Sequence, residues 1–112
     1  MTRQCWLVSN GTVLASAERA DSHRDRGKGL IGRDGVEGAM VLSRPRWVHT
    51  FGMRFAIDVA HLAADGTVLH VTTLVPHRFG APVWNARTVV EAEAGAFERW
   101  GLRLGDVVEL RE

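Results

Sequence analysis

The stretch WVHTFGMRFAIDV, residues 47–59, carries most of the unusual chemistry of this chain. Its first part, residues 47–51, is aromatic and β-branched, and such residues favour a strand. Its second part begins a largely apolar run, residues 55–62, that contains one carboxylate and also favours a strand. Gly52 separates the two runs and permits a bend of the backbone. The stretch therefore predicts two strand segments that meet at a bend, with the flanking segments as their scaffold.

A hairpin is predicted on the N-terminal side of this stretch. Two short apolar runs, residues 4–9 and 12–17, flank Asn10-Gly11. Asn-Gly is the strongest two-residue signal for a hairpin turn, so the two runs should pair as antiparallel strands. A further short strand is predicted at residues 39–42, and Pro45 bounds it.

A second hairpin is predicted on the C-terminal side of the stretch. Ala64-Asp65-Gly66 separates an apolar run at residues 57–63 from another at residues 67–75, and Asp-Gly is a common turn pair. A two-residue turn at this point predicts that His61 lies opposite His70 across the two strands.

Two short helices are also predicted. The first begins at Asp21 or Ser22, either of which can cap a helix, and three following glycines limit its length: Gly27, Gly29 and Gly32. The second covers Ala96–Trp100, and Gly101 supplies the left-handed residue that commonly closes a helix.

The last strands complete the predicted fold class. In Thr88–Glu93 the residues Val89, Glu91 and Glu93 alternate with Thr88, Val90 and Ala92. This two-residue period is typical of a strand with one solvent-exposed face. Residues 107–110 predict a final strand. Many short strands with two brief helices predict a mostly β domain of the α+β class, built as a small antiparallel barrel or rolled sheet.

The composition indicates a single domain, residues 1–112. A chain of 112 residues with 46% hydrophobic residues is large enough to bury a core. Its 14 Lys and Arg against 13 Asp and Glu leave a net charge of +1, which gives no electrostatic case for nucleic acid or an anionic membrane as a partner. The N-terminus shows no apolar leader, and no run approaches the ~20 residues of a membrane span, so a cytoplasmic location is expected.

Several short motifs, in order along the chain, carry a resemblance to a known family. They are Lys28-Gly29-Leu30-Ile31-Gly32-Arg33, Trp47 to Asp58, Asp65-Gly66, Val90-Glu91, Ala94-Gly95, Gly101-Leu102 and Gly105-Asp106. With these motifs the chain resembles domain-of-unknown-function family 192, from about residue 20 to the C-terminus. The resemblance implies a compact β-rich domain and brings no established activity. Ala56 stands where relatives commonly have a proline, which makes the local bend less rigid.

Asp58 is the first candidate for chemistry. Strand periodicity places it on the face of Ala60 and Leu62, where a carboxylate is costly unless it is paired or hydrogen-bonded. Asp58 therefore either accepts hydrogen bonds from backbone amides or from Arg54, or lines a pocket. The structural interpretation is favoured, because no second acid lies nearby for general acid catalysis.

His49 is the second candidate, and its two interpretations are about equally supported. It shares a strand face with Trp47 and Phe51, where a lone histidine is often a packed residue. However, Thr50, Arg54 and Asp58 fall close to it if the chain folds back at Gly52, so His49 could also belong to a site.

A metal site or a cofactor is not expected. His61 and His70 could bind a metal across their two strands, but two imidazoles are half of a zinc site and no Cys or carboxylate is placed to complete it. Cys5 is the single cysteine, so the chain has no intrachain disulfide, and a reduced, partly buried thiol is expected.

Two functions follow from these residues. The favoured one is a non-catalytic module that binds a small polar ligand or a protein segment. Its candidate ligand-binding residues are Trp47, His49, Thr50, Arg54, Asp58 and Trp84. The alternative is a small hydrolase or isomerase that uses His49 as a base with Asp58 and Arg54. The binding module is favoured because a second acid, a nucleophile with its base and a metal set are all missing at recognisable spacing.

Overall fold

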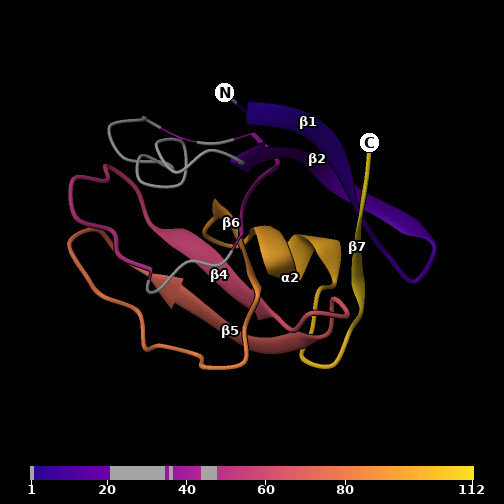
Figure 1. Ribbon diagram of the computed structural model, residues 1–112. Helices are drawn as coiled ribbons and strands as arrows, with labels where there is room; N and C mark the ends of the chain where they lie inside the picture. Colours follow the sequence, from indigo (N-terminus) through magenta and orange to yellow (C-terminus); the bar gives the residue numbers. More distant parts are fainter. Residues whose placement is uncertain (1, 21–34, 36, 44–47) are drawn as a thin grey trace.

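The computed structural model describes residues 2–20, 35, 37–43 and 48–112 (Figure 1). Its elements follow in the order β1 (Thr2–Ser9), β2 (Thr12–Ala20), β3 (Ala39–Ser43), β4 (Ile57–Leu62), β5 (Val68–Leu74), β6 (Thr88–Glu93), α2 (Ala96–Trp100) and β7 (Val108–Arg111). The helix predicted near Asp21 and the predicted site residue Trp47 lie outside the described residues. The domain is mostly β, as predicted.

β1 and β2 form the hairpin that the sequence predicts. Ser9 pairs with Thr12 across the turn, and Asn10 and Gly11 have φ values of 53° and 76°. A two-residue hairpin turn of this kind needs positive φ at both central positions, which Asn and Gly adopt at low cost. These two residues therefore fix the register of the first strand pair.

The strands form one curled sheet in the order β5-β4-β6-β3-β2-β1-β7. The two outer strands approach each other at one end, where Thr67 and Val107 form an isolated bridge. Beside this bridge the amide of Val68 donates a 2.8 Å hydrogen bond to the carbonyl of Asp106. Figure 1 shows the sheet curling around α2. The outline agrees with the predicted rolled sheet.

One strand pair departs from the predicted antiparallel arrangement. β3 runs parallel to β2, with Ala17 opposite Ala39 and Ala20 opposite Leu42, whereas the other pairs of the sheet are antiparallel. A parallel pair needs a long connection, and residues 21–38 provide one. The sheet is thus mostly antiparallel, and the sequence did not reveal the one parallel pair because strand periodicity carries no information about strand direction.

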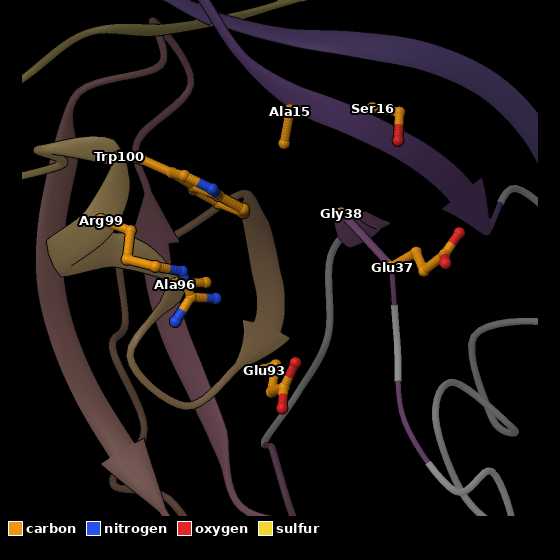
Figure 2. A pocket seen from close by; sticks show the side chains of 8 residues that line it. All are labelled: Ala15, Ser16, Glu37, Gly38, Glu93, Ala96, Arg99 and Trp100. Atoms are coloured by element: carbon orange, nitrogen blue, oxygen red, sulfur yellow. The ribbon is translucent and has the colours of Figure 1, made fainter.

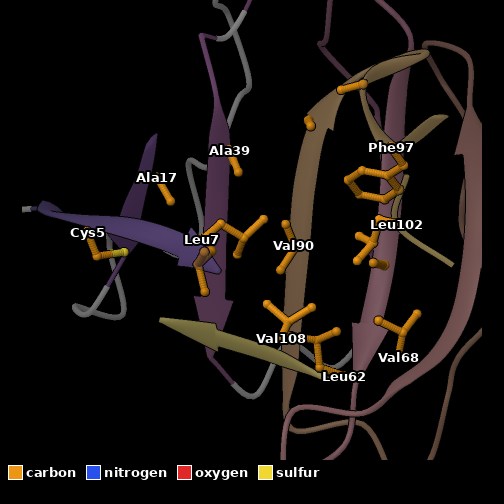
Figure 3. Close-up of a cluster of buried hydrophobic side chains, with 14 residues drawn as sticks. Cys5, Leu7, Ala17, Ala39, Leu62, Val68, Val90, Phe97, Leu102 and Val108 are labelled. Carbon is orange, nitrogen blue, oxygen red and sulfur yellow. The ribbon is translucent and has the colours of Figure 1, made fainter. Parts of the chain in front are cut away.

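Two hydrophobic cores lie on the two faces of the sheet. The core inside the curl joins all the strands to α2 and contains residues that Figure 3 labels: Cys5, Leu7, Ala17, Ala39, Leu62, Val68, Val90, Phe97, Leu102 and Val108. The core on the outer face contains Ala20, Met40, Leu42, Val48, Met53, Ile57, Val59 and Val89. The central strands are therefore covered on both sides.

This double coverage corrects the prediction of a wet face on Thr88–Glu93. Val89 is fully buried and Glu91 is only 5% exposed, because both lie under the outer core. β6 pairs with β3 on one side and β4 on the other, so its backbone is enclosed as well. Only Glu93, at the end of the strand, is exposed on this face.

The predicted strand at residues 47–51 is also wrong in the part that the structure describes. His49 makes a single isolated bridge to Phe79, and no ladder continues from it among the described residues. The next residue, Thr50, instead bonds to the loop after β5, since its amide donates to Arg78 at 2.8 Å. The segment is thus anchored by a loop.

The second hairpin and the C-terminal helix are confirmed. His61 lies opposite His70 in the β4–β5 ladder, as predicted. α2 covers Ala96–Trp100 and ends at Gly101, whose φ is 72°. Within the described residues, no helix has the length and apolar character that crossing a membrane would require.

Candidate functional site

The side chain of Asp58 connects β4 to β5 and to the start of α2. The hydroxyl of Thr73 on β5 donates a 2.7 Å hydrogen bond to Asp58 Oδ1. The backbone amides of Gly95 and Phe97, at the start of α2, donate to Asp58 Oδ2 at 3.0 and 3.2 Å. Both carboxylate oxygens therefore accept hydrogen bonds in a side chain that is 5% exposed. The structure agrees with the prediction that Asp58 accepts hydrogen bonds from backbone amides.

Thr50 is fully buried and links two loops. Its hydroxyl donates a 2.6 Å hydrogen bond to the carbonyl of Val75 and accepts one of 2.8 Å from the amide of Arg78. The amide of His77 donates to the carbonyl of Thr50 at 2.9 Å. These bonds hold the segment before β4 against the loop that follows β5.

His49 belongs to a cluster of rings at the same place. Its imidazole lies 5.9 Å from the ring of Phe51 and 6.2 Å from that of Phe79, between centroids. The two phenylalanine rings are 4.7 Å apart, and they remain 42% and 64% exposed. His49 Nδ1 is buried and has no hydrogen-bond partner among the described residues.

The predicted site residues that the structure describes thus lie in separate places. His49 and Thr50 contact the loop at residues 75–79, whereas the hydrogen bonds of Asp58 go to β5 and α2. Arg54 is exposed, and Trp84 is 92% exposed in the loop before β6. Their role toward a ligand stays a prediction.

Two pockets flank α2. The first, which we call the Trp100 pocket, has a volume of about 380 Å³ and is shown in Figure 2. It is lined by Ala15 and Ser16 of β2, Glu37 and Gly38 before β3, Glu93 of β6, and Ala96, Arg99 and Trp100 of α2. The second, which we call the Asp58 pocket, has a volume of about 390 Å³ and is lined by Asp58, Thr73, Phe97, Glu98 and Arg103 among others.

The Trp100 pocket brings an indole and a guanidinium together on the helix. Figure 2 shows Arg99 and Trp100 extending from α2, with the indole of Trp100 reaching toward Ala15 on β2. The ring of Trp100 packs against Phe97 at 5.6 Å, so part of the indole is supported by the core. The guanidinium of Arg99 passes close over Gly95, where an added Cβ would lie 3.2 Å from Nη1.

Three charged side chains around this pocket have no charged or hydrogen-bonding partner among the described residues. Glu37, Glu93 and Arg99 are exposed, and within the described ranges they form no ion pair and no side-chain hydrogen bond. The chain does pair charges elsewhere, for example Arg111 with Glu109 at 3.1 Å. The Trp100 pocket therefore presents one cation and two anions that are available to a ligand.

The sequence did not predict this pocket, because its residues come from three distant parts of the chain, residues 15–16, 37–38 and 93–100. The sequence placed Trp100 only as the last residue of the short helix predicted at Ala96–Trp100. The signal that was present is local: Arg99 and Trp100 are adjacent, on a helix bounded by Gly95 and Gly101. Only the curl of the sheet brings β2 and residues 37–38 to that helix.

Glu91 is a second feature that the sequence did not reveal. Burial raises the pKa of its carboxyl to about 7. Its neighbours in register on β3 and β4 are Met40 and Val59, which are both apolar and buried. A carboxyl group at such a position is largely protonated below neutral pH.

His61 and His70 lie close together on the outer face, with ring centroids 5.7 Å apart. Burial, and then the charge of His70, lower the pKa of His61. Among the described residues no group of three or more His, Cys, Asp or Glu side chains is arranged to hold a metal ion. The two imidazoles are therefore a pair of polar neighbours, with no further ligand from the described chain.

The fold and these pockets define a small curled-sheet domain with a helix inside the curl. The family model described as "Uncharacterized ACR, COG1430", DUF192, matches residues 6–110, so the chain belongs to this family. Two archaeal relatives, UPF0127 protein PF1050 of Pyrococcus furiosus and UPF0127 protein PYRAB11210 of Pyrococcus abyssi, are each 39% identical over 62 residues. The match covers 55% of this chain and 53% of each relative, about half their length.

Two solved structures share the fold. A protein of unknown function from Novosphingobium aromaticivorans has a TM-score of 0.78 at 20% sequence identity, covering 96% of this chain and 84% of that one. A protein of Sinorhizobium meliloti, described as a proposed transcription regulator, has a TM-score of 0.79 at 24% identity, covering 98% and 94%. At these identities the likeness concerns the fold alone.

Proposed function

We propose that this protein is a non-catalytic binding domain that takes a small polar ligand in the Trp100 pocket. The observation that carries the proposal is an indole that shares one pocket lining with three charged side chains, none of which is paired within the part of the chain that the structure describes. Ligand pockets commonly combine an apolar or aromatic surface with a few polar groups that orient the ligand. The volume of about 380 Å³ is at the lower end of the range of such pockets, which suits a small molecule.

The support for binding over catalysis comes from Asp58. The alternative function, a hydrolase or isomerase, needs Asp58 to orient or assist His49 together with Arg54. Both oxygens of Asp58 already accept hydrogen bonds from Thr73 and from the start of α2. A carboxylate that is committed in this way is suited to positioning a helix, and α2 carries Arg99 and Trp100 into the pocket.

The test is a screen of a small-molecule library by amide chemical-shift perturbation. A ligand of the Trp100 pocket should shift residues 15–16, 37–38 and 96–100. Trp100→Ala should then weaken binding at least tenfold. The matched control is Trp84→Ala, because Trp84 is a nearly fully exposed tryptophan that does not line this pocket.

These two variants, together with His49→Ala, distinguish the competing sites. If Trp84→Ala or His49→Ala abolishes binding while Trp100→Ala does not, the ligand occupies the site predicted from the sequence, and the Trp100 pocket is rejected. Turnover of a library compound that is lost on His49→Ala would favour the enzyme.

A further inference from the structure

We infer that the ligand of the Trp100 pocket is a zwitterion of the α-amino acid type, with a neutral or basic side chain. The inference rests on the proposed function, since it names the chemical class that this site selects. It follows from the signs of the charges that line the pocket and from the position of the indole.

Arg99 and Glu93 have opposite charges, and both line the pocket. Arg99 extends from α2 and Glu93 lies at the end of β6, as Figure 2 shows. Although they are near each other in the fold, they do not form an ion pair with each other. A ligand that carries a carboxylate and an ammonium on neighbouring atoms can satisfy both residues at once, because the guanidinium binds the carboxylate and Glu93 binds the ammonium.

The charges of the lining disfavour neutral ligands such as sugars. A sugar could stack on Trp100, but it would cover the charged groups of Arg99 and Glu93 with hydroxyl groups that only partly replace water. Covering a charge without an opposite charge is unfavourable. The charges of a zwitterion are each compensated, so this class of ligand avoids that cost.

Glu37 is the second carboxylate of the pocket. Two carboxylates and one guanidinium give the lining a charge of −1. A ligand with a second carboxylate would be repelled, whereas one with an additional ammonium group would be attracted. The pocket is therefore expected to prefer lysine or a neutral amino acid over glutamate.

The indole of Trp100 is fixed on one side by Phe97 and lies in the lining of the pocket. An apolar or aromatic side chain of the ligand can pack on the indole, and a cationic side chain can interact with its π face. The lining thus provides a place for each of the three parts of an amino acid.

The experiment compares matched probes by calorimetry and by amide shifts at residues 96–100. L-phenylalanine is compared with phenethylamine, which lacks the carboxylate, and with 3-phenylpropanoate, which lacks the ammonium. L-lysine is compared with L-glutamate, and methyl α-glucoside represents neutral sugars. We expect phenylalanine to bind at least tenfold more tightly than either analogue, and lysine more tightly than glutamate.

Two charge variants assign the two ends of the ligand. Arg99→Gln should remove the advantage of phenylalanine over phenethylamine, and Glu93→Gln should remove its advantage over 3-phenylpropanoate. Both residues are exposed, so both variants should fold. Arg103→Gln is the matched control, because Arg103 lines the Asp58 pocket and not the Trp100 pocket.

The outcomes separate this inference from the proposed function. If methyl α-glucoside or a singly charged analogue binds at the Trp100 pocket as tightly as phenylalanine, the zwitterion is overturned and the binding function stands. If no probe shifts the pocket residues but a library compound does, the ligand class is likewise overturned. If the library also gives no ligand there, the proposed function fails with it.

Discussion

The amide of Gly95, which precedes α2, donates a 3.0 Å hydrogen bond to the carboxylate of Asp58 on β4, 37 positions earlier in the chain. Phe97 donates to the same oxygen at 3.2 Å. The first amides of a helix have no internal partners, and the N-cap residue of α2 provides no side-chain cap. A strand residue therefore caps the helix, and in doing so it fixes the place of Arg99 and Trp100.

The first prediction concerns this cap. Asp58→Ala leaves the hydroxyl of Thr73 and the two amides without their acceptor, so it should lower the free energy of unfolding by about 1–3 kcal/mol. Urea denaturation measures the change. Thr73→Val is the control, because it removes only one of the three hydrogen bonds and should cost about 0.5–1.5 kcal/mol. Parental stability in Asp58→Ala would show that the cap contributes nothing.

The second prediction concerns Glu91 and pH. The pKa of Glu91 is about 7 in the folded protein and 4.5 in the unfolded chain. Between pH 4.5 and pH 7, the folded protein therefore keeps a proton that the unfolded chain releases. The stabilising contribution of Glu91 is then fully present below pH 4.5 and is lost as the pH rises through 7. The full effect is on the order of 3 kcal/mol, since each pKa unit corresponds to about 1.4 kcal/mol.

Glu91→Gln isolates this effect. His61 acts in the opposite direction, because burial lowers its pKa and the unfolded chain binds the proton more readily around pH 6.5. His61 is present in both proteins, so its contribution cancels in the difference in stability between the parent and Glu91→Gln. In thermal melts from pH 4 to 8, the difference in stability between the two proteins should grow with pH. A difference that stays constant would contradict the raised pKa of Glu91.

The sequence predicted the elements whose signals are local. Asn10-Gly11 specifies its hairpin through the backbone conformations of two adjacent residues, and Gly101 likewise closes α2. His61 lies opposite His70 as predicted, although a register shift between His61 and Leu62 separates this pair from the turn. Each of these features depends on a few neighbouring residues, and sequence patterns describe such interactions well.

The features that the sequence missed depend on distant segments. Glu91 occupies an alternating position that is typical of a solvent-exposed face, and only the outer core shows that this face is buried. The direction of Asp58 toward α2 was left open because no local pattern connects residues 37 positions apart. The Trp100 pocket was missed for the same reason, because distant segments form its lining.

The third prediction concerns Thr50. Thr50→Val keeps the size of the side chain but removes the hydroxyl that bonds to Val75 and Arg78, so it should cost about 1–3 kcal/mol. Thr72→Val is the control, because Thr72 lies on β5 and has no side-chain hydrogen bond among the described residues; its effect should stay within about 0.5 kcal/mol. Equal effects of the two variants in urea melts would argue against the link between the loops.

The fourth prediction compares two glycines of similar backbone conformation. Gly38 has a φ of 70° and Gly101 a φ of 72°, so alanine at either position has the same left-handed strain, about 1–2 kcal/mol. Around Gly101 an added Cβ meets no atom within 4 Å, whereas at Gly38 it would overlap the carbonyl oxygen of Ser16 on β2. Gly38→Ala must therefore push the edge of the Trp100 pocket away from β2.

The two alanine variants should accordingly differ in both stability and binding. Gly101→Ala should lower the free energy of unfolding only by the left-handed strain. Gly38→Ala should lower it further, because the Glu37-Gly38 segment and β2 must separate. Urea melts measure the first difference, and amide shifts at Ala15 and Ser16 report the movement of the strand. If both variants lose the same stability and residues 15–16 keep their shifts, the close approach of Gly38 to Ser16 does not shape the pocket.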